Sequence, residues 1–145
     1  MIGEVIAAAL GTFAFAVLFG VPKKYYLYCG IIGGCSWIVY LIFEEFGTVA
    51  ASLAAAVAVV LLSRLTAIRE KCPVTIFLIC GIFPLVPGSY VYWTAYYFVT
   101  DQMSLAAENG YMAIKIAFAI VLGIVFVFEI PQRAFISVLG KKNMQ

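Results

Sequence analysis

Long apolar stretches separated by short polar segments run through the whole chain. A membrane-spanning helix needs about 17–25 predominantly apolar residues, and five stretches meet that length. They are predicted at about residues 2–19, 25–43, 48–65, 74–99 and 111–128. Because the intervening segments are short, the pattern predicts a single transmembrane domain over residues 1–145. The expected fold class is an all-α polytopic membrane protein.

Composition supports a lipid environment. Of the 145 residues, 66% are hydrophobic and 11% are charged, with a mean hydropathy of +1.10. A soluble domain carries about 25% charged residues, so the bilayer is the expected solvent. The net charge of +2 is too small to indicate nucleic-acid binding. The first stretch carries Glu4 in place of a basic leader and has no clear cleavage site, which favours a retained helix over a signal peptide.

The basic residues predict the orientation of the chain in the membrane. Cytoplasmic segments are enriched in Lys and Arg. With the N-terminus outside and the C-terminus inside, eight of the nine basic residues are cytoplasmic and Lys115 is the exception. The eight are Lys23, Lys24, Arg64, Arg69, Lys71, Arg133, Lys141 and Lys142. A re-entrant fourth stretch would place the C-terminal basic cluster outside, so one broken span of two half-helices is expected.

The fourth stretch contains Pro84-Leu85-Val86-Pro87-Gly88-Ser89. Proline has no N–H and clashes with the carbonyl four residues back, so Pro84 is expected to free the Cys80 carbonyl and Pro87 the Phe83 carbonyl. Proline also disfavours helical geometry in the residue before it, and glycine tolerates almost any backbone angle. The chain is therefore expected to unwind here, within the membrane.

An unwound segment at membrane depth is tolerated only where protein or a water-filled cavity receives its polar groups. Transporters use such broken helices to hold substrates. Ser89 is expected to cap the second half-helix, whose positive end would suit a carboxylate, while freed carbonyls would suit an ammonium group. The candidate substrate-binding residues are Pro84, Leu85, Val86, Pro87, Gly88 and Ser89. A simple proline kink is the competing interpretation.

Small and aromatic residues predict how the helices pack. Small residues allow close helix contact in lipid, and they recur at four-residue spacing in two rows of the third stretch and one pair in the second. These are Gly47, Ala51 and Ala55; Ala50, Ala54 and Ala58; and Gly30 and Gly34. Plain packing and a sliding surface for transport are both compatible with them. The aromatic cluster over residues 90–98 suits a membrane-interface belt or a pocket lining.

Ionisable and sulfur-bearing residues give few chemical candidates. Glu4 suits either a proton carrier or an interfacial charge, and Lys115 either attracts anions or snorkels to the headgroups. Asp101 and Glu108 are expected in solvated loops. Four cysteines without a CxxC pair, and no histidine, predict neither a metal site nor disulfides. No cofactor is expected, and no nucleophile–base constellation suggests an enzyme.

Four segments together resemble the threonine/serine exporter family, in its small-subunit or C-terminal-half form. They are Phe19-Gly20-Val21-Pro22-Lys23-Lys24, Cys29-Gly30-Ile31-Ile32-Gly33-Gly34, Cys72-Pro73-Val74-Thr75-Ile76-Phe77 and Pro84-Leu85-Val86-Pro87-Gly88. The similarity spans about residues 15–128, and Pro-Leu-Val-Pro-Gly is its most specific element. Only that motif transfers by position as a candidate site.

The resemblance implies a proton-motive-force-dependent exporter of small hydrophilic metabolites in the cell inner membrane. Threonine and serine, or a small carboxylate such as succinate, are the implied substrates. The implied partner is a larger exporter subunit with a cytoplasmic domain. An odd number of spans would also let two homologous halves form an inverted pair, so a homo-oligomer is the other option. A non-transporting membrane scaffold or assembly protein is the alternative function.

Overall fold

The computed structural model describes residues 2–131, which form helices joined by short turns. The α-helices are α1 (Ile2–Leu18), α2 (Tyr26–Phe43), α3 (Thr48–Glu70), α4 (Thr75–Ile82), α5 (Gly88–Val99) and α6 (Met103–Phe128). Three short 3₁₀ turns lie between them: η1 (Lys23–Tyr25), η2 (Glu44–Phe46) and η3 (Phe83–Leu85). Each apolar stretch expected from the sequence is therefore helical, and the fourth is divided between α4 and α5.

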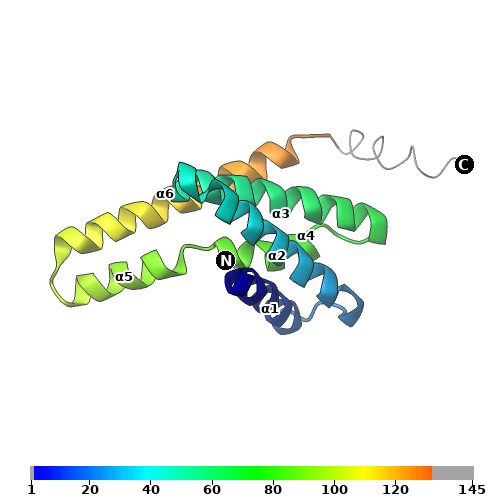
Figure 1. Cartoon of the computed structure of the whole chain (residues 1–145), viewed down its shortest axis with the longest axis horizontal. Helices are drawn as coiled ribbons and strands as arrows, with labels where there is room; N and C mark the ends of the chain where they lie inside the picture. The colour runs from blue at the N-terminus through cyan, green and yellow to red at the C-terminus, as the bar shows by residue number, and fades with distance from the viewer. Residues whose placement is uncertain (1, 132–145) are drawn as a thin grey trace, which may run out of the picture.

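The helices form a body, made of α1–α4 and the C-terminal half of α6, and a projecting hairpin, made of α5 and the N-terminal half of α6 (Figure 1). In the body, α2 packs between α1 and α3, and α4 packs against both α2 and α3. The long helix α6 packs against α3 with one half and against α5 with the other (Figure 1). Within the described residues, α5 has substantial contact with α6 alone. The core lies where α2, α3 and α4 meet, around Cys29, Val59, Phe77 and Cys80.

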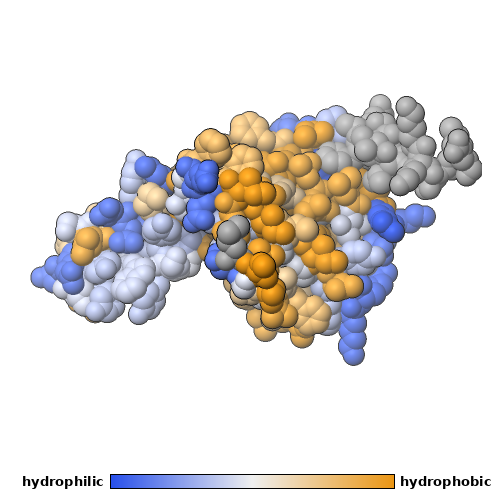
Figure 2. Space-filling view, viewed as in Figure 1, coloured by the Kyte–Doolittle hydropathy of each residue, from blue (hydrophilic) through white to orange (hydrophobic). Residues whose placement is uncertain are grey.

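Within residues 2–131, three helical segments are long and apolar enough to cross a membrane: residues 23–46, 48–70 and 103–128. A fourth crossing is possible if α4 and α5, which meet at a bend of 50°, act as one span. Helix α1, with 17 residues, lies at the lower end of the spanning range. Many large apolar side chains are exposed, including Leu18 at 73% and Phe118 at 66%, and Figure 2 shows apolar residues over much of the body. Such a surface requires a lipid solvent.

Two helices are longer than expected from the sequence. Helix α3 continues past residue 65 to Glu70 and ends at Lys71, which adopts a left-handed conformation with φ of 53°. Helix α6 begins at Met103 rather than near residue 111. Glu108 therefore lies in a helix, and its expected loop position is wrong, while Lys115 lies well inside α6. Hydropathy along the sequence predicts only the apolar part of a helix. It does not predict additional polar turns that are helical because they pack against the rest of the protein.

Close helix contacts occur where small residues face each other. Gly30 and Gly34 are buried against α1, and a Cβ atom at either would lie 3.3 Å from an atom of Ala9. On α3, Ala51 and Ala55 are fully buried. Gly123 brings α6 against α3, since its Cβ would lie 3.0 Å from the Ala56 Cβ. The predicted packing role of the small residues in α2 and α3 is thus confirmed for these positions.

Part of the expected orientation signal lies outside the described residues. Arg133, Lys141 and Lys142 belong to that remaining segment. The last described helix ends at Phe128 with Glu129 as its C-cap, in agreement with the predicted helix end.

Candidate functional site

The chain breaks between α4 and α5 where the proline motif predicts. Helix α4 ends at Ile82, residues 83–85 tighten into the 3₁₀ turn η3, and Val86 adopts an extended conformation with ψ of 130°. Pro87, with φ of −75° and ψ of 53°, leads into α5 at Gly88. The residue before each proline was expected to leave helical geometry. Val86 does so, whereas Phe83 keeps φ of −54° and ψ of −42°.

The carbonyls expected to be free have partners. The Cys80 carbonyl accepts a hydrogen bond from the Phe83 N–H, and the Phe83 carbonyl accepts one from the Val86 N–H at 3.2 Å. Each is an i→i+3 bond of the 3₁₀ type, which recovers a bond lost from the α-helical pattern. The expectation of two unpaired carbonyls for an ammonium group is therefore wrong.

The expected capping role of Ser89 is also wrong. Pro87 occupies the N-cap position of α5, no side chain in the described part of the chain caps this helix, and Ser89 lies inside its first turn. The first N–H groups of a helix have no partner within it. The beginning of α5 therefore keeps the positive end of the helix dipole, but without a side-chain cap.

A small cavity of about 120 Å³ lies directly at this break, and we call it the break cavity. Five of the six candidate site residues line it, and Gly88 is the one that does not. The other lining residues come from α2, α3, α5 and α6. The full lining is Trp37, Tyr40, Thr48, Ser52, Pro84, Leu85, Val86, Pro87, Ser89, Tyr90 and Ile116. Hydroxyl groups from three helices and an indole thus surround a space large enough for about four water molecules.

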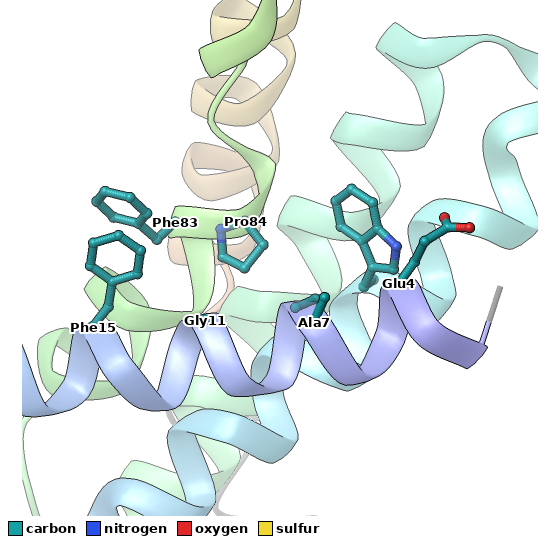
Figure 3. A pocket seen from close by; sticks show the side chains of 8 residues that line it. Glu4, Ala7, Gly11, Phe15, Phe83 and Pro84 are labelled. Carbon is teal, nitrogen blue, oxygen red and sulfur yellow. The ribbon is translucent and has the colours of Figure 1, made fainter.

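A second cavity of about 300 Å³ adjoins the break cavity, and we call it the α1 cavity. Trp37 and Pro84 line both cavities. Figure 3 shows Glu4 at one end of the α1 cavity and the rings of Phe15 and Phe83 at the other. Ala7, Ala8 and Gly11 complete its lining. This space is mainly apolar, with one carboxylate at its end.

Trp37 carries the strongest polar signal in the site. Its indole Nε1 is buried and makes no hydrogen bond of normal geometry within residues 2–131, while the Glu4 carboxylate at the end of the α1 cavity lies close enough to interact with it. A buried donor without an acceptor costs about 1–3 kcal/mol, so native structures rarely leave one. The Trp37 ring stacks on Tyr40 with ring centroids 4.9 Å apart, which fixes its position. A ligand oxygen in either adjoining cavity would satisfy this donor.

Sequence reasoning did not identify the site residues outside the proline motif. Trp37 and Tyr40 lie near the end of α2, while Thr48 and Ser52 open α3. They are isolated polar groups in apolar stretches, and only the fold brings them to the break. The one available signal was a Trp, a Tyr, a Thr and a Ser within one short segment flanking a loop.

The aromatic cluster of α5 divides into two parts. Tyr90 lines the break cavity. Tyr92, Trp93 and Tyr96 are exposed, and neighbouring rings contact each other at centroid distances of 5.4–6.4 Å. Pocket lining is thus confirmed for Tyr90, whereas the remaining rings form a surface patch.

No group of three His, Cys, Asp or Glu residues in the described part of the chain could hold a metal ion. The four cysteines are free thiols, with Cys29 and Cys80 buried in the core. The break cavity is therefore lined by hydroxyl, indole and apolar groups rather than by a cluster of metal-ligating side chains.

A sequence model of the threonine/serine exporter family (ThrE) matches residues 4–130. The chain belongs to the threonine/serine exporter family. The match includes the break and every residue that lines the two cavities. No curated protein and no solved structure gives a significant match. Family membership and the apolar helices together make this exporter-type chain a multi-pass membrane protein.

Proposed function

We propose that this chain is a subunit of a secondary transporter that exports threonine, serine or a small carboxylate such as succinate. In this proposal the substrate occupies the break cavity and extends into the adjoining α1 cavity. We further propose that the substrate is carried without chemical change and that the chain is not an enzyme. The buried indole N–H of Trp37 between the two cavities, which makes no hydrogen bond of normal geometry within residues 2–131, is the observation that carries the proposal.

Several groups around the site suit a small molecule with both polar and charged ends. The Trp37 N–H donates to a carboxylate or hydroxyl oxygen, and the positive end of α5 favours the same carboxylate. The hydroxyl-bearing residues Thr48, Ser52 and Tyr40 line the opposite walls. The Ser52 hydroxyl already donates to the Thr48 carbonyl at 2.8 Å, which leaves its lone pairs as acceptors for a ligand hydroxyl or ammonium group.

We place the chain in the cell inner membrane with five spans, the N-terminus outside and the C-terminus in the cytoplasm. The distribution of basic residues favours this orientation. Helices α4 and α5 then form one broken span, with the break about 12 Å from the beginning of the eight-residue helix α4. This depth suits a substrate site near the middle of the bilayer.

The transporter is proposed to work with a larger exporter subunit that has a cytoplasmic domain, or as a homo-oligomer. Support comes from α5, which has no buried residue and packs substantially on α6 alone within the described chain. Val86 and Ser89, which line the break cavity, are exposed. A second subunit would cover both and complete the walls of the site.

The test is transport by Trp37→Phe, which keeps the ring but removes the N–H donor. Proteoliposomes containing the chain and its co-expressed partner are loaded with labelled threonine, serine or succinate, and efflux is measured under a pH gradient. Loss of one hydrogen bond, worth about 0.5–1.5 kcal/mol, predicts an increase of about two- to tenfold in the half-saturating substrate concentration. Tyr26→Phe is the matched control, because it also removes one polar group from an aromatic side chain of α2, lies outside both cavities, and is expected to behave as wild type.

Three results would contradict the proposal, the first two for the site and the third for transport itself. Equal half-saturating concentrations for Trp37→Phe and Tyr26→Phe would show that the site is elsewhere. Unchanged efflux of all three probes after Pro87 and Gly88 are both replaced by Ala would show the same. No efflux of any probe by the wild-type pair would favour the non-transporting scaffold instead.

A further inference from the structure

A third cavity of about 510 Å³ lies between the α1–α2 connection and α4, and we call it the loop cavity. Phe19, Gly20, Val21 and Pro22 form one wall, and Thr75, Ile76, Ile79 and Cys80 form the other. Two of the sequence motifs, Phe19–Lys24 and Cys72–Phe77, thus meet at one cavity. The proposed substrate site does not explain either motif.

Three phenylalanine rings lie between the loop cavity and the α1 cavity. Phe15 and Phe83 line the α1 cavity, and Phe19 lines the loop cavity. The Phe15 and Phe83 ring centroids are 3.5 Å apart, and Figure 3 shows the two rings side by side at the end of the α1 cavity. Phe19 lies 5.9 Å from Phe15 and 6.2 Å from Phe83, centroid to centroid. The three rings therefore form the partition between the α1 cavity and the loop cavity.

The position of Phe83 connects these rings to the proposed substrate site. Phe83 begins η3, and the next residue, Pro84, lines both the break cavity and the α1 cavity. A short 3₁₀ turn has weaker hydrogen-bond geometry than an α-helix, so this segment deforms at lower cost than its neighbours. A shift of η3 that withdraws the Phe83 ring would also move Pro84 at the site.

The loop cavity has the character of an entrance for polar solutes. Its lining includes Thr75 and exposes a larger polar share than the lining of the α1 cavity. Lys23 and Lys24 follow Pro22 directly in the chain and are exposed. Exposed cations beside a cavity raise the local concentration of carboxylate-bearing molecules. In the proposed orientation this end of the chain faces the cytoplasm, where an exported metabolite begins.

We propose that the loop cavity is the cytoplasmic vestibule of the transporter and binds the same small carboxylate-bearing metabolite before it reaches the break. The contact between Phe15 and Phe83 closes the passage from this vestibule to the substrate site. The inference rests on the proposed function for its substrate, but its geometry concerns a separate cavity and a separate pair of residues.

The test is one-sided thiol labelling in a chain whose four native cysteines are replaced. A single cysteine is placed either in the vestibule, as Thr75→Cys, or in the α1 cavity, as Ala8→Cys. A membrane-impermeant methanethiosulfonate reagent is applied from the cytoplasmic face. Each reporter is combined with Phe83→Ala, with Phe83→Leu, which keeps apolar bulk without the ring, and with the control Phe13→Ala. Phe13 is on α1 but contacts Tyr26 and lies outside both cavities.

The expected result is labelling of Thr75→Cys in every background. Ala8→Cys is expected to react about two- to tenfold faster with Phe83→Ala or Phe83→Leu than with wild-type Phe83 or with Phe13→Ala. The ratio corresponds to the loss of one aromatic pair contact, that between Phe15 and Phe83. Threonine, serine or succinate at saturating concentration is expected to slow the labelling of Thr75→Cys.

The gate is overturned if Ala8→Cys reacts equally in the Phe83 and Phe13 variants. The vestibule is overturned if Thr75→Cys does not react from the cytoplasmic face, or if none of the three solutes protects it. Neither labelling rate requires flux. A wild-type protein that labels as expected but moves no solute would therefore refute the proposed function and leave the two-cavity arrangement standing.

Discussion

Gly33 is the tightest contact between helices α1 and α2, and Gly33→Ala tests whether that contact sets their spacing. A Cβ atom at this position would lie 2.0 Å from the Thr12 Oγ1 and 2.6 Å from the Thr12 Cβ. Nonbonded carbon atoms prefer separations of about 3.5–4.0 Å. The Thr12 hydroxyl donates to the Ala8 carbonyl at 2.8 Å, and the side chain is fully buried. Rotation of Thr12 cannot remove the clash with its own Cβ, so the helices must separate by about 1 Å.

The magnitude follows from two opposing effects. Overpacking a well-packed contact costs about 1–3 kcal/mol, while replacing a helical Gly by Ala recovers up to about 1 kcal/mol. We expect Gly33→Ala to lower the free energy of unfolding by about 1–2 kcal/mol. Gly11→Ala, on α1, is the control because a Cβ there meets nothing within 4 Å. That variant is expected to be more stable than wild type by about 0.5–1 kcal/mol.

The assay is unfolding of the purified protein by sodium dodecyl sulfate in mixed micelles, followed by tryptophan fluorescence. Thr12→Gly removes all the atoms that clash with the new Cβ. The double variant Gly33→Ala with Thr12→Gly should therefore show a favourable coupling free energy of at least about 1 kcal/mol. Equal stability of Gly33→Ala and wild type, or additivity in the double variant, would refute the proposed spacing of α1 and α2.

Two further predictions concern single side chains. Arg64 is buried on α3, and its Nη1 donates to the Val127 carbonyl at 2.5 Å and the Ile130 carbonyl at 2.9 Å. Arg64→Ala should therefore lower the free energy of unfolding by about 2–3 kcal/mol in the same assay. A loss below about 0.5 kcal/mol would contradict this role of Arg64 at the end of α6. Glu4 is the acid that lines the α1 cavity, and if it carries the coupled proton, Glu4→Gln should abolish threonine accumulation driven by a pH gradient while threonine–threonine exchange continues. Accumulation equal to wild type would place proton coupling elsewhere.

The sequence predicted the structure best where the backbone conformation depends only on neighbouring residues. Two prolines three residues apart interrupt a helix whatever surrounds them, and the break lies where Pro84 and Pro87 predict it. The hydrogen bonds at the break were less predictable. A 3₁₀ turn restored partners for the carbonyls of Cys80 and Phe83, and a rule that considers only the α-helical pattern misses this alternative.

Tertiary packing explains what the sequence did not predict. The N-terminal turns of α6 are polar, yet they are helical because Ala106 is buried and Gly110 lies against Thr94 of α5. The break cavity likewise has Trp37 of α2 and Ser52 of α3 in its lining. No hydrophobic periodicity in the sequence indicates that these two residues lie together. Hydropathy located the helices, whereas the cavity depends on how they are arranged around the break.

The continuity of α6 has a mechanical consequence. This helix is one 26-residue rod that packs on α5 near its beginning and on α3 near its end. Because α5 has no other large contact within the described chain, we expect a tilt of α5 to tilt α6 with it. The close contact of Gly123 with Ala56 and the Leu53 carbonyl is the point about which α6 would rotate against α3. A force applied to the projecting hairpin would thus reach the opposite end of α6, where Arg64 donates to the carbonyls of Val127 and Ile130.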